Sequence, residues 1–86
     1  MYWVYILQCG DGTLYTGSTN DLPARIAVHN KGKGAKYTRS RLPVTLVYSE
    51  LVADRSQALK REYAIKQLSR ADKIALVHST RAKHPL

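Results

Sequence analysis

The pattern of apolar positions predicts three short strands along the chain. Residues 2–9 (YWVYILQC) are largely aromatic or branched on both alternating faces, which is typical of a central strand covered on both sides. Gly10, Asp11 and Gly12 form a turn signal, so residues 13–18 are expected to return as an antiparallel partner. Residues 45–51 (TLVYSEL) have the composition of a third strand.

The length of the first turn decides which side chains share a face of the sheet. A two-residue loop of Asp11 and Gly12 would place Tyr5 and Tyr15 on opposite faces, because it shifts the pairing by one residue. A loop of three or five residues would place both tyrosines on one face. A common site for the two therefore requires an odd loop length or a bulge in the strand pair.

Capping signals predict a helix directly after the second strand. Asn20 or Asp21 can cap this helix, and Pro23 is tolerated in its first turn because those amides have no acceptor within the helix. The helix is expected to run to about Lys31. Glycines at positions 32 and 34 end it and open a loop.

Two further helices are expected near the carboxyl end. Asp54, followed three residues later by Gln57, resembles a capping box before the helical stretch SQALKREYAIKQL. Ser69 with Asp72 is a second such signal, and it opens a shorter helix to about Ser79. The order β-β-α-β-α-α describes an α+β fold, a small three-stranded sheet with helices packed on it.

Length and composition predict one small domain. The 86 residues suffice for one modest core, so we assign residues 1–80 to a single domain and residues 81–86 (RAKHPL) to a flexible tail. No apolar run approaches the ~18 residues of a membrane-spanning helix, and the apolar start has no basic leader. Cys9 is the only cysteine, which excludes an intrachain disulfide and fits a reducing, cytoplasmic location. We assume a monomer.

The balance of charge favours a polyanionic partner. Fourteen Lys and Arg stand against six Asp and Glu, a formal net charge of +8, and there is no acidic residue between Asp21 and Glu50. A solvated basic loop is the alternative; a membrane surface is disfavoured because these cations do not follow an amphipathic helix. Tyr37, among them, is suited to stacking on an unpaired base. The predicted nucleic-acid-binding residues are Lys31, Lys33, Lys36, Tyr37, Arg39 and Arg41.

Candidate catalytic groups converge where the second strand meets the first helix. Arg25 and His29 are one helical turn apart and project from one face, at the border between core and solvent. Tyr15 precedes them, and Gly17 lies where the strand is expected to approach a ligand or another backbone closely. A phenol, a guanidinium and an imidazole together suit a phosphodiester substrate.

A carboxylate on the second long helix also requires a reason. A helical wheel places Glu62 inside the arc of its apolar neighbours, Ala58, Leu59, Tyr63 and Ile65. One explanation is an ion pair with Lys66 at i+4, or with a neighbouring arginine. The other is a hard-cation ligand, since Mg²⁺ takes one or two carboxylates together with waters and phosphate oxygens.

Each candidate has a structural alternative when it is considered alone. Tyr5 and Tyr15 fit core tyrosines with satisfied hydroxyls, Arg25 fits a surface residue, and His29 fits a structural histidine. Cys9 and the remaining histidines lack the spacing of zinc ligands. The functional interpretation therefore rests on the set and not on any single member.

The set resembles the GIY-YIG nuclease superfamily, in its small stand-alone YhbQ/YazA-like branch. Trp3-Val4-Tyr5 matches the first motif and Tyr15-Thr16-Gly17 the second, with a short hairpin between them. Arg25 and His29 match the helix positions of the family, and Glu62 matches its metal-binding glutamate. Trp3 replaces a glycine and Thr16 an isoleucine. The asparagine that many of these nucleases carry after the glutamate helix is absent, because the only asparagines are Asn20 and Asn30.

The resemblance implies a three-stranded mixed sheet and hydrolysis of a DNA phosphodiester with one divalent cation, Mg²⁺ or Mn²⁺. Glu62 would hold the cation, and Arg25 would contact the scissile phosphate. Tyr15 is the first choice as general base, with Tyr5 orienting the water and His29 relaying the proton.

Two classes of function follow from these residues. The leading one is a structure-selective or weakly specific DNA endonuclease in repair or recombination, because no dedicated base-reading element is evident. The alternative is a non-catalytic nucleic-acid-binding module that keeps the fold and charge, which the absent asparagine favours. A small domain that binds an acidic protein is a third possibility.

Overall fold

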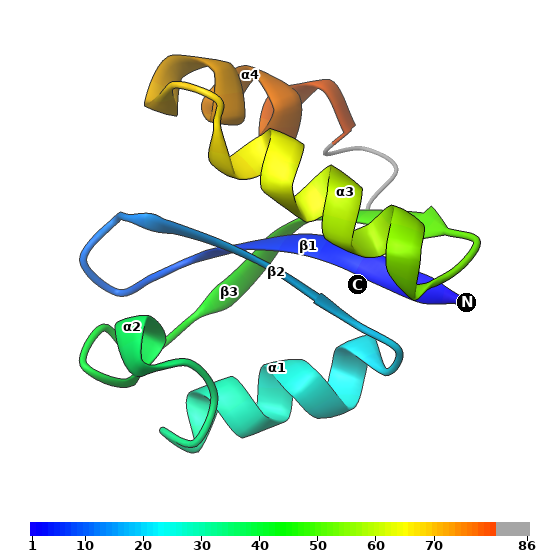
Figure 1. The fold of residues 1–86 in the computed structure, drawn as a ribbon. Helices are drawn as coiled ribbons and strands as arrows, with labels where there is room; N and C mark the ends of the chain where they lie inside the picture. Colours follow the sequence, from blue (N-terminus) through cyan, green and yellow to red (C-terminus); the bar gives the residue numbers. More distant parts are fainter. Residues whose placement is uncertain (81–86) are drawn as a thin grey trace.

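The computed structural model describes residues 1–80, and the predicted flexible tail, residues 81–86, lies outside this range. The predicted order β-β-α-β-α-α is confirmed with one addition, a short helix α2 within the predicted loop (Figure 1). No helix in the described range is long and apolar enough to span a membrane. The elements are β1 (Tyr2–Gln8), β2 (Leu14–Thr19), α1 (Leu22–Asn30), α2 (Lys36–Arg39), β3 (Thr45–Val52), α3 (Arg55–Lys66) and α4 (Arg70–Thr80).

The sheet has the order β2-β1-β3, so β1 is the central strand, as its two apolar faces predicted. Both strand pairs are antiparallel, and the expectation of a mixed sheet is therefore wrong. The reason lies in the position of β1. Strands β2 and β3 run in the same direction but are separated by β1, so their common direction creates no parallel pair.

The hairpin between β1 and β2 has an odd loop. Tyr5 pairs with Gly17, and Leu7 pairs with Tyr15. Residues 9–13 form the loop, closed by a 2.8 Å hydrogen bond from the Cys9 amide to the Thr13 carbonyl. Directly paired residues share a face, so Tyr5 and Tyr15 lie on the same side of the sheet, as a common site requires.

Helices cover both faces of the sheet (Figure 1). The face of Val4 and Ile6 packs with residues of α3 and α4, including Ile65 and Val77. The opposite face, with Tyr5 and Leu7, packs with α1. Because β2 lies at the edge of the sheet, side chains from both layers can meet around its outer side.

Three predicted helix starts are confirmed by their hydrogen bonds. The Asp21 carboxylate accepts from the Ala24 amide at 3.2 Å, and the Asp54 carboxylate accepts from the Gln57 amide at 2.9 Å. The Ser69 hydroxyl accepts from the amide of Asp72 at 3.1 Å. Such caps contribute about 1 kcal/mol each.

The face of α3 differs from the helical-wheel expectation. Ala58 and Ile65 are buried, but Leu59 is 50% exposed and Tyr63 is 68% exposed. The wheel treated all four as one apolar arc. Helix α3 therefore contacts the sheet through a narrower stripe than its composition suggested.

Candidate active site

His29 is the centre of the candidate site, and it is fully buried. The expectation that it borders solvent is wrong, because the ring lies between β1 and the segment that follows α1. Its Nε2 is 3.0 Å from the Tyr5 hydroxyl, and its Nδ1 is 2.8 Å from the Thr38 Oγ1. Residues from β1, α1 and α2 therefore meet at one imidazole.

The hydrogen bonds around His29 define one direction of donation. The Thr38 hydroxyl donates its proton to the carbonyl of Ala35 at 3.0 Å. It must therefore accept from His29, which places the ring proton on Nδ1. Nε2 is then the acceptor, and the Tyr5 hydroxyl donates to it. The result is a buried chain of donors that runs from Tyr5 through His29 to Thr38.

The electrostatic surroundings keep His29 neutral. Burial lowers the pKa of the His29 imidazole below its usual value, and the nearby positive charge of Arg25 lowers it further. Burial raises the pKa of the Tyr5 hydroxyl, while a hydrogen-bonding interaction with Arg25 opposes this shift. Arg25 is half-buried on α1, so a single guanidinium acts on both members of the pair.

The lowered pKa of His29 predicts a pH-dependent stability. The unfolded imidazole takes up a proton near its ordinary pKa of ~6.5, whereas the folded imidazole resists protonation until lower pH. The unfolded state therefore binds more protons, and the free energy of unfolding should fall as the pH drops from about 7.5 to about 5.5. Urea denaturation across this range measures the slope. His29→Gln should flatten it, whereas a matched change of the exposed His78 to Gln should not; equal slopes in wild type and His29→Gln would contradict this account.

Two glycines make room for the buried pair. A Cβ on Gly17 would lie 2.5 Å from the Tyr5 hydroxyl oxygen, and a Cβ on Gly34 would overlap the Nδ1 of His29. Gly17 was expected to admit a ligand or another backbone, but the group that approaches it is the Tyr5 side chain. The absence of a side chain at these positions is therefore a steric requirement of the Tyr5–His29 contact.

Gly34→Ala should destabilise the protein and disturb the imidazole. The added methyl overlaps the ring in a packed core, which costs about 2 kcal/mol, and for a domain of this size that lowers the Tm by about 10 °C. Thermal denaturation measures the loss. Lys33→Ala, a truncation of an exposed neighbour, is the control. An unchanged Tm in Gly34→Ala would contradict the steric overlap between a side chain at this position and the His29 ring.

Tyr15 and Tyr37 extend the site toward α2. The Tyr15 ring meets the His29 ring edge-on at 5.4 Å between centroids, and the Tyr37 ring stacks on Tyr15 at 6.1 Å. Within residues 1–80, the Tyr15 hydroxyl has no hydrogen-bond partner. The aromatic contact brings α2 and its basic residues next to the candidate catalytic groups.

The basic residues of the loop differ in their availability. Lys31, Lys33, Lys36 and Arg39 are exposed. Arg41 is half-buried; its Nε lies 3.1 Å from a carboxylate oxygen of Asp11, and its guanidinium lies 4.0 Å over the Tyr37 ring. Arg41 therefore supports the conformation of Tyr37, and it is a weaker candidate for phosphate binding than the four exposed cations.

Glu62 reaches the outer side of β2 from the opposite layer. Its Oε1 accepts a 2.7 Å hydrogen bond from the hydroxyl of Ser18, and its Oε2 lies 2.7 Å from the Nζ of Lys66. Its side chain is 18% exposed. The ion pair with Lys66 that the spacing suggested is thus present, and the negative charge of Glu62 also acts on the Tyr5 hydroxyl across the edge strand.

The donor set at Glu62 fits only one kind of metal site. Within residues 1–80 there is no group of three or more His, Cys, Asp or Glu side chains that could enclose a cation. Zinc prefers such a closed set, whereas Mg²⁺ is commonly bound by one carboxylate, waters and substrate phosphate. Glu62 fits the second arrangement, provided that Lys66 moves away from Oε2.

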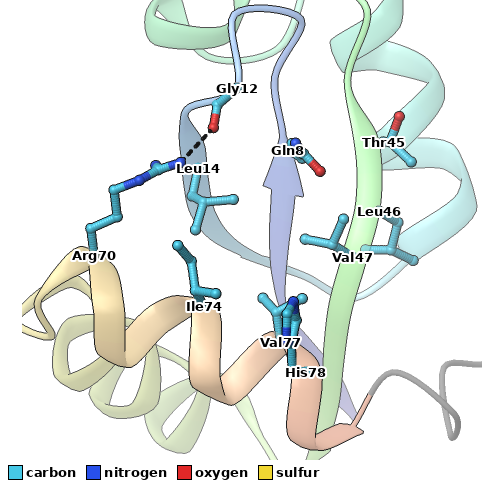
Figure 2. Close-up of a pocket in the computed structure, with 10 residues that line it drawn as sticks. All are labelled: Gln8, Gly12, Leu14, Thr45, Leu46, Val47, Arg70, Ile74, Val77 and His78. Atoms are coloured by element: carbon cyan, nitrogen blue, oxygen red, sulfur yellow. Dashed lines mark hydrogen bonds between the residues drawn. The ribbon is translucent and has the colours of Figure 1, made fainter.

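A pocket of about 210 Å³ wraps around the outer side of β2, where it adjoins the candidate catalytic groups. A larger pocket of about 480 Å³ lies on the α4 side of the sheet, with Arg70 spanning it to the Gly12 carbonyl (Figure 2). None of the predicted site residues lines the larger pocket. The smaller one is lined by Leu14, Tyr15, Thr16, Tyr37, Lys66 and Lys73.

Several residues of the site were not predicted from the sequence. Thr38 lies in a segment that was interpreted only as a basic loop, yet it is fully buried against His29. Ser18 follows the second motif, and strand alternation could have placed it on the face of Glu62. Asn30 is engaged elsewhere, since its amide exchanges hydrogen bonds with the backbone of Val44 at 2.8 and 3.2 Å.

The fold and the motif residues define a GIY-YIG domain. The family model of the GIY-YIG catalytic domain matches residues 1–75, and the chain belongs to this family.

Comparison with individual proteins narrows the assignment to the UPF0213 group. A UPF0213 protein of Halobacterium salinarum is 58% identical over 88% of this chain and 99% of its own length. The solution structure of a UPF0213 protein from Bacillus halodurans has a TM-score of 0.62 and 46% identity, covering 94% of this chain and 87% of that one. The solution structure of a protein from E. faecalis has a TM-score of 0.63 and 37% identity, covering 99% and 91%.

Proposed function

We propose that the protein is a divalent-metal-dependent endonuclease that hydrolyses DNA phosphodiester bonds. The observation that carries this proposal is the buried Tyr5–His29–Thr38 chain, a proton path that lies beside a guanidinium and a carboxylate. The neutral imidazole leaves Nε2 free to accept the proton that the Tyr5 hydroxyl donates. Membership of the GIY-YIG catalytic domain family supports the same chemistry.

The hydrogen-bond geometry favours Tyr5 over Tyr15 as the group that accepts the proton of the attacking water. The Tyr5 hydroxyl donates to His29 Nε2, so its oxygen can take a proton from water while its own proton passes to the imidazole. Thr38 remains the acceptor for Nδ1–H in both states and fixes the ring. Tyr15, with an unpartnered hydroxyl within residues 1–80, is suited to orienting the water or the phosphate.

Arg25 and Glu62 supply the charge that phosphoryl chemistry requires. Arg25 would contact the scissile phosphate, where a planar fork of donors follows the redistribution of charge. Glu62 would hold one Mg²⁺ or Mn²⁺, which, when bound, polarises a phosphate oxygen and stabilises the leaving oxyanion. Ser18 orients the Glu62 carboxylate by its hydrogen bond.

The exposed cations around α2 support nucleic acid as the partner. Lys31, Lys33, Lys36 and Arg39 would contact backbone phosphates of the substrate. These contacts carry no base-specific information, which supports structure-selective cleavage in repair or recombination. We also propose that the protein is a monomer in the cytoplasm; the single cysteine, which is buried and unpaired, supports the reducing location.

A non-catalytic nucleic-acid-binding module is the second candidate function. The specific observation in its favour is the state of Glu62, whose two oxygens are already engaged by Ser18 and Lys66. Asn30 cannot replace the absent family asparagine, because its amide is bound to Val44. The fold and the basic surface would then serve binding alone.

Cleavage of labelled single-stranded, duplex, flap and branched DNA tests the proposal. We expect cleavage of at least one substrate with Mg²⁺ or Mn²⁺ and none with EDTA. Binding of the same substrates is measured in parallel by fluorescence anisotropy. Binding without cleavage of any substrate would support the binding module, and an absence of both would exclude DNA as the partner.

A further inference from the structure

Lys66 stands between two parts of the candidate site. Its Nζ lies 2.7 Å from the Oε2 of Glu62, the oxygen that a metal would need. Its side chain also lines the pocket of about 210 Å³ on the outer side of β2, together with Tyr15 and Tyr37. One ammonium group therefore has two alternative positions within reach.

The ion pair of Lys66 is weak enough to be exchanged. The Lys66 side chain is 47% exposed, and ion pairs of this kind contribute about 0–1 kcal/mol because water competes for both charges. An ammonium ion and a divalent cation repel each other when both lie against one carboxylate oxygen. The ion pair of Lys66 therefore competes with metal binding at Glu62.

The pocket beside Lys66 has the chemistry of an anion site. Lys73 of α4 contributes a second ammonium group, and none of the six lining residues is acidic. Tyr15 and Tyr37 also line the pocket, and the Tyr15 hydroxyl is unpartnered within residues 1–80. Two lysines and a phenol suit a phosphate with a flexible approach, because ammonium groups bind phosphate as point charges.

We propose that this pocket is a second phosphate subsite, which binds a DNA backbone phosphate adjoining the scissile one, and that Lys66 exchanges Glu62 for this phosphate. The proposal rests on the proposed nuclease function. In the free protein Lys66 occupies the carboxylate, and in the complex it turns to the phosphate and leaves Glu62 open to the cation. Metal binding and DNA binding then promote each other through a single side chain.

The affinity of the DNA-free protein for Mn²⁺ tests the exchange directly. Electron paramagnetic resonance of free Mn²⁺ gives the Kd for wild type, Lys66→Met and Lys60→Met. Lys60 is exposed on the same helix, so its replacement removes the same charge without touching Glu62. We expect Lys66→Met to bind Mn²⁺ about fivefold more tightly than Lys60→Met, because the competing ammonium is gone. Equal affinities in the two variants would overturn the proposal.

A double-mutant cycle without metal tests whether the Lys66 released from Glu62 binds DNA phosphate. In EDTA, Glu62→Gln should release Lys66 and tighten binding of a labelled single-stranded oligonucleotide about threefold, and this gain should vanish in the Lys66→Met background. A gain of equal size in both backgrounds would show a general charge effect and would overturn the exchange. Lys73→Met should reduce the salt dependence of binding by about one phosphate contact, and an unchanged slope would exclude the subsite.

Neither measurement depends on cleavage, so the two hypotheses fail separately. If wild type binds DNA and shows the coupling but cleaves none of the substrates, the nuclease proposal fails, and the pocket stands as a backbone-phosphate site that exchanges Lys66 with Glu62. If wild type cleaves DNA while Lys66→Met and Lys60→Met behave alike in the Mn²⁺ assay, the nuclease proposal stands and the exchange fails.

Discussion

Glu62→Gln should reduce metal-dependent DNA cleavage by about 10³-fold, which corresponds to roughly 4 kcal/mol of transition-state stabilisation. The amide has the shape of the carboxylate and keeps an oxygen for the Ser18 hydroxyl, so the fold should be retained. It lacks the negative charge that holds a hard cation. Single-turnover cleavage at saturating DNA, with circular dichroism as a check of folding, measures the effect.

Lys66→Met removes the other partner of the ion pair and leaves the carboxylate in place. If Glu62 served only the ion pair, removal of either partner would have the same consequence, since the contact is lost in both variants. We expect Lys66→Met to retain cleavage within about tenfold of wild type at saturating DNA, because the carboxylate remains. Equal losses in the two variants would assign Glu62 to the ion pair alone.

Most of the fold could be predicted from local sequence signals. The capping side chains of Asp21, Asp54 and Ser69 accept hydrogen bonds from amides three residues later, so these helix starts could be found from the sequence alone. The central position of β1 followed from its two apolar faces. The register of the hairpin could not be predicted, because the turn sequence allowed loops of even and odd length; the structure has the odd one.

The errors concern burial and pairing, which depend on distant parts of the chain. The sequence spacing of Arg25 and His29 placed both on one helical face, but it contained no information about Thr38, which closes over the imidazole from α2. Tyr63 is exposed because α3 buries only a narrow stripe that includes Ala58 and Ile65, and the apolar composition of the helix did not show this. Helix α2 itself is one short turn, which periodicity does not detect.

The motif residues could be identified from the sequence because their side-chain chemistry is characteristic. Their contacts with one another depend on the fold and could not be predicted in the same way. Tyr5 lies far in sequence from Arg25 and His29, and it meets them only because β1 runs over α1. That arrangement favours Tyr5 as the proton acceptor, whereas Tyr15 was the first choice among the roles assigned after the family resemblance. The steric requirement at Gly34 has no signature in the sequence, since any loop glycine would look the same.

Tyr5→Phe should slow cleavage by about 10³-fold while leaving DNA affinity unchanged, because the ring remains but the path from water to His29 is cut. It should also cost about 1–3 kcal/mol of stability, since the buried Nε2 loses its donor. Quenched cleavage assays across pH measure the loss of rate, and denaturation measures the loss of stability. The wild-type rate should stay level above about pH 6.5, because the lowered pKa of His29 keeps the imidazole neutral there.

Tyr48→Phe is the control for Tyr5→Phe, because Tyr48 is 3% exposed and donates its hydroxyl to Glu50 in the core on the other face of the sheet. The two variants lose comparable buried hydroxyls, so both should be destabilised, but only Tyr5→Phe should lose cleavage. Tyr15→Phe should keep the stability of the wild type, because its hydroxyl is unpartnered within residues 1–80. A larger loss of cleavage in Tyr15→Phe than in Tyr5→Phe would assign the role of proton acceptor to Tyr15. The Tyr5–His29 hydrogen bond would then have a structural role, in holding β2 in position.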